Sequence, residues 1–252
     1  MKSEGGIALI TLNRPHVLNA LNREVMSELY ETFVKFGRDD KVRVIVITGN
    51  GKAFAAGADI AEMKDYTPQE AREFSQLGHK TMDTIQNTGK PVIAAINGYA
   101  LGGGLELALA CDIILASANA LLGVPEVNLG TIQGFGGTQR LTRLVGKNFA
   151  KELIFTADAI PAGKAHEMGL VNRVYPPADL LPETEKMAQK IAEKGPVALR
   201  LAKKVIENGY DKKLPDGCKL EIEAFAECFT TSDLKEGMKA FLEKRKPVFT
   251  NR

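Results

Sequence analysis

The chain has 252 residues, of which 44% are hydrophobic and 25% charged, a composition typical of a folded globular protein and not of a disordered, collagen-like or coiled-coil chain. The 33 lysines and arginines exceed the 31 aspartates and glutamates by only two, which argues against dedicated nucleic-acid binding. Three cysteines without C-x-x-C spacing predict neither a disulfide framework nor a zinc site, as in a protein of the reducing cytoplasm.

The sequence predicts no targeting or membrane segment. The first six residues include a lysine, a glutamate and two glycines and precede only six largely apolar positions, a stretch that is too short for a signal peptide. The longest apolar stretch, residues 105–116, is interrupted by Glu106 and Asp112 and falls short of the roughly 20 residues that a membrane span needs. We therefore expect a soluble protein.

Five short runs rich in β-branched residues predict strands, and most precede a glycine-containing turn and then helical periodicity. Between the first two runs, apolar residues at helical spacing predict a helix over residues 22–36. The second and third runs are almost uninterrupted, as in parallel strands that are covered on both faces. We therefore predict an α/β fold with a central parallel sheet. The five runs are residues 7–12, 42–48, 92–96, 112–115 and 170–174.

Beyond residue 177 only helical patterns remain, and no strict internal repeat or low-complexity tract is present. Pro196 suits the first turn of one helix, and a second apolar stripe follows. The last predicted helix has Ser232 or Asp233 as its cap and Lys244 in its final turn, which matches the helix dipole. These helices either fold back on their own sheet or pack against another copy of the chain, and periodicity leaves both alternatives open.

Common catalytic motifs are missing. The glycine at residue 98 is not followed by the spacing of a dinucleotide-binding loop, and the segment ending at Lys52 lacks two residues of a phosphate-binding loop. The sequence holds no G-x-S-x-G, and its three histidines lie far apart. A nucleotide-dependent enzyme or a serine or cysteine hydrolase is therefore not predicted.

Two glycine-containing turns, at residues 52–60 and 97–106, each follow a predicted strand and open toward a helix. Small side chains let a ligand approach the backbone, and N–H groups at the start of a helix point outward as donors. The alternative is that both turns only provide tight crossovers with close packing.

Two glutamates lie in apolar surroundings near these turns. Glu106 falls in the first turn of a predicted helix, where it would complement the helix dipole even without a catalytic role. Glu126 falls in the mostly apolar segment 123–130, where a lone acid is either paired, kept for proton transfer or turned to solvent. Together, two acids and two donor turns provide what enolate chemistry needs: N–H groups for an oxyanion and carboxylates that move protons.

These residues, together with five further segments, closely resemble the enoyl-CoA hydratase (crotonase) family nearly from end to end. The resemblance implies a spiral of β-β-α units over residues 1–190 and a helical region over 191–252 that forms trimers, which commonly pair into hexamers. The further segments are residues 12–15, 18–21, 130–141, 236–238 and 241–246.

The resemblance also implies the chemistry. The family's two oxyanion-hole amides correspond to Ala58 and Gly103, and its two catalytic glutamates to Glu106 and Glu126. The implied reaction is the reversible addition of water to a trans-2-enoyl-CoA, which gives a 3-hydroxyacyl-CoA. Glu106 would activate the water and Glu126 would deliver a proton to C2. The acyl-CoA thioester is the substrate, and no prosthetic group or metal is implied.

Contacts to coenzyme A carry over by resemblance as well, and three positions depart from the pattern common in the family. Ala61 replaces a lysine, Val124 replaces a glutamine and Gln133 replaces a proline, so we expect a different shape of the loop around Glu126. Val124 and the segment 62–73 are predicted to line the acyl end. The residues predicted to contact coenzyme A are Ala20, Ala56, Ala58, Asp59, Ile60 and Ala61, with Phe241 and Lys244 reaching the coenzyme A of a neighbouring copy.

Two other functions compete with hydration. An enoyl-CoA isomerase would move a proton between C2 and C4 with much of the same site, although retention of both acids favours a hydratase. An RNA-binding or scaffolding role is the non-catalytic alternative, and the small net charge gives it little support. Its local basic cluster consists of Lys203, Lys204, Lys212 and Lys213.

Overall fold

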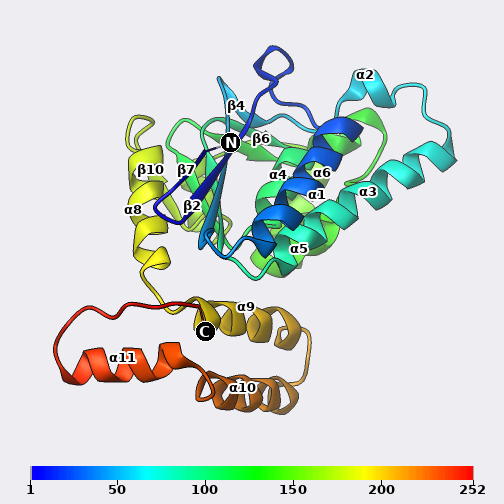
Figure 1. The fold of residues 1–252 in the computed structure, drawn as a ribbon. Coiled ribbons are helices and arrows are strands. Elements are labelled where there is room, and N and C mark those ends of the chain that lie inside the picture. The colour runs from blue at the N-terminus through cyan, green and yellow to red at the C-terminus, as the bar shows by residue number, and fades with distance from the viewer. Residues whose placement is uncertain (1, 252) are drawn as a thin grey trace.

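The computed structural model of the chain describes residues 2–251, and Figure 1 shows two sheets among helices with a separate helical layer beyond them. The six-stranded sheet has the order β1-β2-β3-β5-β7-β10, and only its first pair is antiparallel. Its strands are β1 (Lys2–Glu4), β2 (Ile7–Leu12), β3 (Val44–Gly49), β5 (Val92–Ile96), β7 (Ile113–Ser117) and β10 (Arg173–Tyr175). The four-stranded sheet has the order β4 (Ala53–Ala55), β6 (Tyr99–Leu101), β8 (Leu121–Gly123) and β9 (Ile160–Pro161).

The helices begin where the sequence provides capping groups. The side chain of Asn22 accepts a hydrogen bond from the N–H of Val25 at the start of α1, and Thr67 and Glu70 form a reciprocal capping box at the start of α3. The helices are α1 (Arg23–Arg38), α2 (Ile60–Met63), α3 (Pro68–Asn87), α4 (Gly103–Leu109), α5 (Gly137–Val145), α6 (Lys147–Thr156), α7 (Ala162–Glu167), α8 (Leu180–Ala192), α9 (Pro196–Gly209), α10 (Leu214–Cys228) and α11 (Ser232–Leu242), with the short 3-10 helices η1 (Pro15–Val17) and η2 (Pro125–Leu129).

A β-β-α unit recurs along the chain. Each unit gives a long strand to the larger sheet, a short strand to the smaller sheet and then a helix, as in β3-β4-α3, β5-β6-α4 and β7-β8-η2. Because β3, β5 and β7 are neighbours, and β4, β6 and β8 are too, successive units stack in the same order. The predicted spiral of β-β-α units is confirmed.

The core has two sides because the central strands alternate. In β3, Val44 and Val46 face a cluster with α8, while Ile45 and Ile47 face the main core. All four are almost fully buried. Figure 1 shows α1 and α3 on one side of the larger sheet and α8 on the other. The predicted central sheet with both faces covered is therefore confirmed. The two glycine-containing turns, at residues 52–60 and 97–106, follow the ends of β3 and β5.

The structure corrects three predicted boundaries. The strand predicted over residues 170–174 begins only at Arg173, because the chain turns after α7 through Gly169, whose φ is +78°. The cap of α11 is Thr231, whose side chain accepts a hydrogen bond from the N–H of Leu234. Lys244 lies beyond the end of α11, and its φ is +55°, outside the helical range.

The helices α9, α10 and α11 form a layer apart from the sheets (Figure 1). Lys203 of α9 joins this layer to the core through a 2.8 Å ion pair with Asp112 and a hydrogen bond to the carbonyl of Lys90. The layer nevertheless exposes large apolar side chains, so it does not fold back to cover the sheet. They include Leu214, Phe225, Phe241 and Leu242, each at least 66% exposed.

Among residues 2–251, no helix has the length and apolar character needed to cross a membrane. Within the same part of the chain, no three histidine, cysteine, aspartate or glutamate side chains gather in a way that suits a metal ion.

Candidate active site

The two glycine-containing turns lie side by side because β4 and β6 pair in parallel. Gly104, in the first turn of α4, packs directly on the carbonyl of Ala55, and a Cβ built at residue 104 would lie 1.9 Å from that oxygen. Glycine is therefore required where the two turns touch. This contact brings the start of α4 against the segment that leads into α2.

Two backbone N–H groups meet at this contact. A Cβ built on Gly103 would lie 3.5 Å from the nitrogen of Ala58. Among residues 2–251, neither the N–H of Ala58 nor that of Gly103 donates to a protein acceptor. Gly102, with a φ of +50°, turns the chain so that Gly103 begins the helix. Two adjacent unpaired donors at the start of a helix are suited to an oxyanion.

Glu106 lies in the first turn of α4, and only 2% of the residue is exposed. Its Oε1 accepts hydrogen bonds from the N–H groups of Phe135 (2.8 Å) and Gly137 (2.6 Å). Burial raises the pKa of Glu106 to about 7 although these two N–H groups oppose the rise, and the carboxylate of Glu126 adds to it. A carboxyl group with this pKa can accept or release a proton near neutral pH.

Glu126 comes from a different element, the 3-10 helix η2, and is half-buried. Its Oε2 accepts a hydrogen bond from Nε2 of Gln133 at 2.9 Å. Its Oε1 lies toward the donor turn, because a Cβ built on Gly102 would be 2.9 Å from it. Burial raises the pKa of Glu126, and the bond from Gln133 opposes that rise. The structure thus brings both predicted glutamates to the predicted turns.

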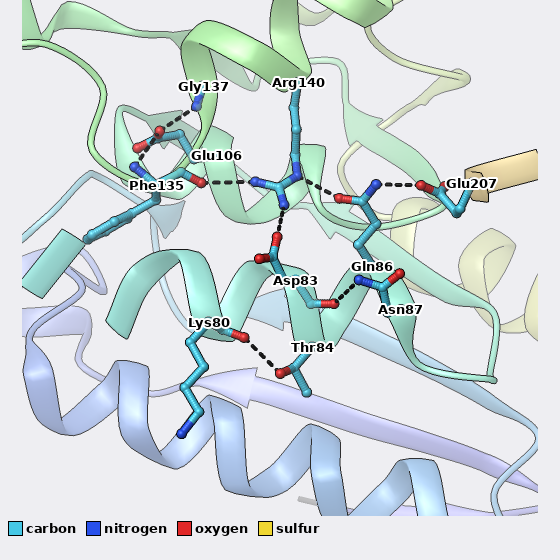
Figure 2. Close-up of polar contacts among 10 residues, drawn as sticks. All are labelled: Lys80, Asp83, Thr84, Gln86, Asn87, Glu106, Phe135, Gly137, Arg140 and Glu207. Carbon is cyan, nitrogen blue, oxygen red and sulfur yellow. Dashed lines mark hydrogen bonds and ion pairs between the residues drawn. The ribbon is translucent and has the colours of Figure 1, made fainter. Parts of the chain in front are cut away.

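The loop that holds Glu106 is itself anchored, as Figure 2 shows. The carbonyl of Phe135 accepts a hydrogen bond from Nη1 of Arg140 at 3.1 Å. Nη2 of Arg140 forms a 2.7 Å ion pair with Asp83, and its Nε donates to Oε1 of Gln86 at 2.8 Å. Gln86 in turn donates to Glu207 of α9. A continuous set of hydrogen bonds therefore runs from Glu106 to α3 and to the C-terminal helical layer.

Sequence reasoning missed Arg140 and the loop amides as functional groups. Arg140 is three residues past Gly137 in a segment that supported the family resemblance, but its partners Asp83 and Gln86 lie more than fifty residues earlier in the chain. Only the tertiary structure reveals that this arginine stands behind Glu106.

Most residues predicted to contact coenzyme A lie around the Ala58 turn. Leu21 pairs with Ala58 in a short parallel bridge, which places Ala20 beside this segment. Arg14 links the carbonyl of Ala20 (2.7 Å) to the carboxylate of Asp59 (3.0 Å).

The other predicted contacts lie farther along the chain. Ala56 is half-buried in the same turn, whereas Ile60 and Ala61 are exposed at the start of α2. Phe241 of α11 is 83% exposed, and Lys244 follows this helix. Figure 1 places α11 and α2 at opposite ends of the molecule. Within one chain, these two residues are therefore not brought to the site.

Comparison with known proteins gives consistent matches over the whole chain. The profile of a family described as enoyl-CoA hydratase/isomerase matches residues 2–252. A crotonyl-CoA hydratase of Syntrophomonas wolfei is 48% identical over 100% of this chain and 97% of its own length. A short-chain-enoyl-CoA hydratase of Clostridium acetobutylicum is 48% identical over 98% of this chain and 95% of its own length. The crystal structure of an enoyl-CoA hydratase from Bacillus anthracis superimposes with a TM-score of 0.96 at 42% identity, covering 98% of this chain and 96% of that one.

Proposed function

The chain belongs to the enoyl-CoA hydratase/isomerase family and is an enoyl-CoA hydratase, a carbon–oxygen lyase, and we propose that Glu106 and Glu126 are its catalytic acids at an oxyanion hole formed by Ala58 and Gly103. One observation carries this assignment of residues. Two carboxyl groups with raised pKa values, from different elements, lie beside two adjacent N–H groups that have no acceptor in the described chain.

The reaction adds water across the C2–C3 double bond of a trans-2-enoyl-CoA. The thioester carbonyl oxygen gains negative charge and accepts hydrogen bonds from the N–H groups of Ala58 and Gly103. Glu106 takes a proton from water as the water oxygen bonds to C3, and Glu126 gives a proton to C2. The product is a 3-hydroxyacyl-CoA, and one proton returns from Glu106 to Glu126 before the next turnover. Each step needs only groups that this site provides and the substrate itself.

The C-terminal helical layer is proposed to complete the site in an assembly. We divide the chain into a catalytic core of residues 1–190 and an oligomerisation region of residues 191–252. The exposed apolar side chains of α10 and α11 support burial of this layer against other copies of the chain, and we propose a cytoplasmic homotrimer, or a hexamer of two trimers. Ala20 and residues 56–61 would hold coenzyme A in one copy, while Phe241 and Lys244 would reach the coenzyme A of its neighbour.

The first test is the loss of ultraviolet absorbance of the conjugated thioester when crotonyl-CoA is mixed with the purified protein. We expect rapid loss with the wild-type protein and a decrease in kcat of about 10²- to 10⁴-fold for Glu126→Gln, because a positioned acid or base contributes that much. Conversion of a 3-enoyl-CoA to a 2-enoyl-CoA faster than hydration of crotonyl-CoA would instead support an isomerase. Equal rates for the wild-type protein and Glu126→Gln would contradict the role of this acid.

Removing the anchor behind Glu106 is expected to slow the reaction without removing a catalytic group. In Arg140→Gln the Phe135–Gly137 loop loses its bond to the guanidinium, so we expect kcat to fall by about 10- to 100-fold. Because the charge of Arg140 lowers the pKa of Glu106, the pH optimum should also move to higher pH. The measurement is kcat for crotonyl-CoA between pH 5 and 10.

The matched control for this prediction is Arg143→Gln. Arg143 lies on the same helix, one turn farther along, and pairs with Asp211 at the surface. Within residues 2–251, its side chain bonds to Gln139 and Asp211 and not to the loop that holds Glu106. A pH optimum that shifts equally in the two variants would show that Arg140 acts only through general charge.

A further inference from the structure

Gln133 stands between the two glutamates. Only 6% of the residue is exposed. Its Nε2 donates to Oε2 of Glu126 at 2.9 Å and to the carbonyl of Val124 at 3.3 Å. A Cβ built on Gly137 would lie 2.9 Å from Cγ of Gln133 and 3.0 Å from Oε1 of Glu106. The side chain of Gln133 therefore passes close to one acid and binds the other.

The orientation of this amide is determined by its surroundings. Both groups at its Nε2 are acceptors, so exchanging Nε2 and Oε1 would place an oxygen against a carboxylate and a carbonyl. In the observed orientation, however, Oε1 is buried, and among residues 2–251 it has no hydrogen-bond partner. A buried acceptor without a partner lowers stability, and such a group calls for an explanation other than stability.

The bond from Gln133 distinguishes the two oxygens of Glu126. Oε2 is held by the amide, whereas Oε1 lies next to Gly102, at the turn that begins the oxyanion hole. A carboxyl group held through one oxygen rotates less freely, so Oε1 of Glu126 stays directed toward the turn at Gly102, where the proposed oxyanion hole begins. An apolar side chain at residue 133 would leave the carboxyl group of Glu126 only the bond from its own backbone N–H.

We propose, on the basis of the hydratase function above, that Gln133 is a positioning residue of the reaction. Its amide fixes the carboxyl group of Glu126 so that Oε1 of Glu126 is the oxygen that transfers the proton. Gln133 does not contact the reacting atoms in this mechanism. It acts through Glu126. The unpaired Oε1 of Gln133 lowers the stability of the fold at the same time.

The charge environment gives this role a measurable signature. Glu106 of α4 is the ionisable group that faces Glu126 across the site, with Arg140 of α5 behind it. The charged residues of α6, the helix that packs against η2, are exposed. The bond from Gln133 is thus the main effect that opposes the rise in the pKa of Glu126. Without this bond, the pKa of Glu126 rises further.

The test compares Gln133→Met, which keeps the length of the side chain and removes the amide, with the wild-type protein. For crotonyl-CoA hydration we expect kcat to fall by about 10- to 100-fold with a KM within about threefold. The pH optimum should move to higher pH. The melting temperature should change little, because the substitution removes the unpaired oxygen of Gln133 but also leaves the carbonyl of Val124 without its donor. Gln139→Met, an exposed position of α5, is the matched control and should change none of these values.

Two results would overturn the inference. One is a kcat within twofold of the wild-type value with an unchanged pH optimum. The other is a lower melting temperature with a loss of activity that only follows the loss of folded protein, since this would make Gln133 a structural residue. A wild-type protein that hydrates no enoyl-CoA would overturn the proposed function as well, so failure of the function is distinguished from failure of the inference alone.

Discussion

Replacing Glu106 with glutamine is expected to lower kcat for crotonyl-CoA hydration by about 10²- to 10⁴-fold and, at the same time, to stabilise the folded protein above pH 7. The loss of activity follows because an amide cannot take a proton from water. The amide oxygen can still accept hydrogen bonds from the N–H groups of Phe135 and Gly137, so the local structure should survive.

The gain in stability follows from the raised pKa of the buried carboxyl group. Glu106 has a pKa of about 7 in the folded protein and an ordinary value of 4.5, so the folded state binds its proton more tightly than the unfolded state does. Ionised Glu106 therefore destabilises the fold above pH 7, by about 3 kcal/mol, and this cost disappears as the pH falls toward 4.5. Glutamine carries no charge at any pH and avoids this cost.

The measurement is the free energy of unfolding in urea at pH 8 and pH 5 for both proteins. Glu106→Gln should be more stable than the wild-type protein at pH 8, and the difference should shrink at pH 5. If the wild-type protein is as stable as Glu106→Gln at pH 8, or more stable, then burial of the ionised carboxyl group does not destabilise the fold. The inactive but folded variant should also still bind a CoA ester, which separates catalysis from binding.

The second large effect is expected at Gly104, where the two donor turns touch. In Gly104→Ala the added Cβ would lie 1.9 Å from the carbonyl oxygen of Ala55, which belongs to backbone that cannot move aside cheaply. The turns must separate, which spreads the N–H groups of Ala58 and Gly103. We expect the free energy of unfolding to fall by about 3 kcal/mol and kcat to fall by about 100-fold or more.

Gly163→Ala provides the matched control. Gly163 lies inside α7, and a Cβ built there meets no atom within 4 Å. Alanine also loses less backbone entropy on folding, so the control should be unchanged or more stable by about 0.4–1 kcal/mol, with full activity. Thermal denaturation and the crotonyl-CoA assay check both variants. A stable, active Gly104→Ala would show that the two turns need not touch.

The long helices and strands and the two glutamates could be predicted from the sequence because each gives a recognisable pattern among neighbouring residues. The runs that became β3 and β5 are uninterrupted apolar segments, and they lie at the centre of the sheet as predicted. Glu106 and Glu126 were noticeable as acids in apolar surroundings, and the structure brings both to the glycine turns. The strands β4, β6 and β8, three residues each, are too short for any periodicity, so the second sheet could not be predicted from the pattern.

The roles of Gln133 and Arg140, which hold the two glutamates in place, could not be predicted for a different reason. Gln133 appeared only as a departure from a pattern, and its hydrogen bond to Glu126 depends on how the loop folds around η2. The role of Arg140 depends on α3, whose contacting residues lie more than fifty positions earlier. Polar contacts between distant segments follow no spacing rule in the sequence, whereas an acidic residue within an apolar segment can be recognised from the sequence alone.

The spiral has a consequence for the time course of folding. The groups of the site come from successive turns of the chain: Ala58 from one, Gly103 and Glu106 from the next, and Glu126 from the one after it. The amides that hold Glu106 arrive only at residues 135 and 137, and the last hydrogen bonds behind them reach residue 207. A nascent chain that has left the ribosome only as far as β8 would contain both donors of the proposed oxyanion hole and still lack the amides that hold Glu106, its proposed general base, so we expect catalytic competence to come late in synthesis.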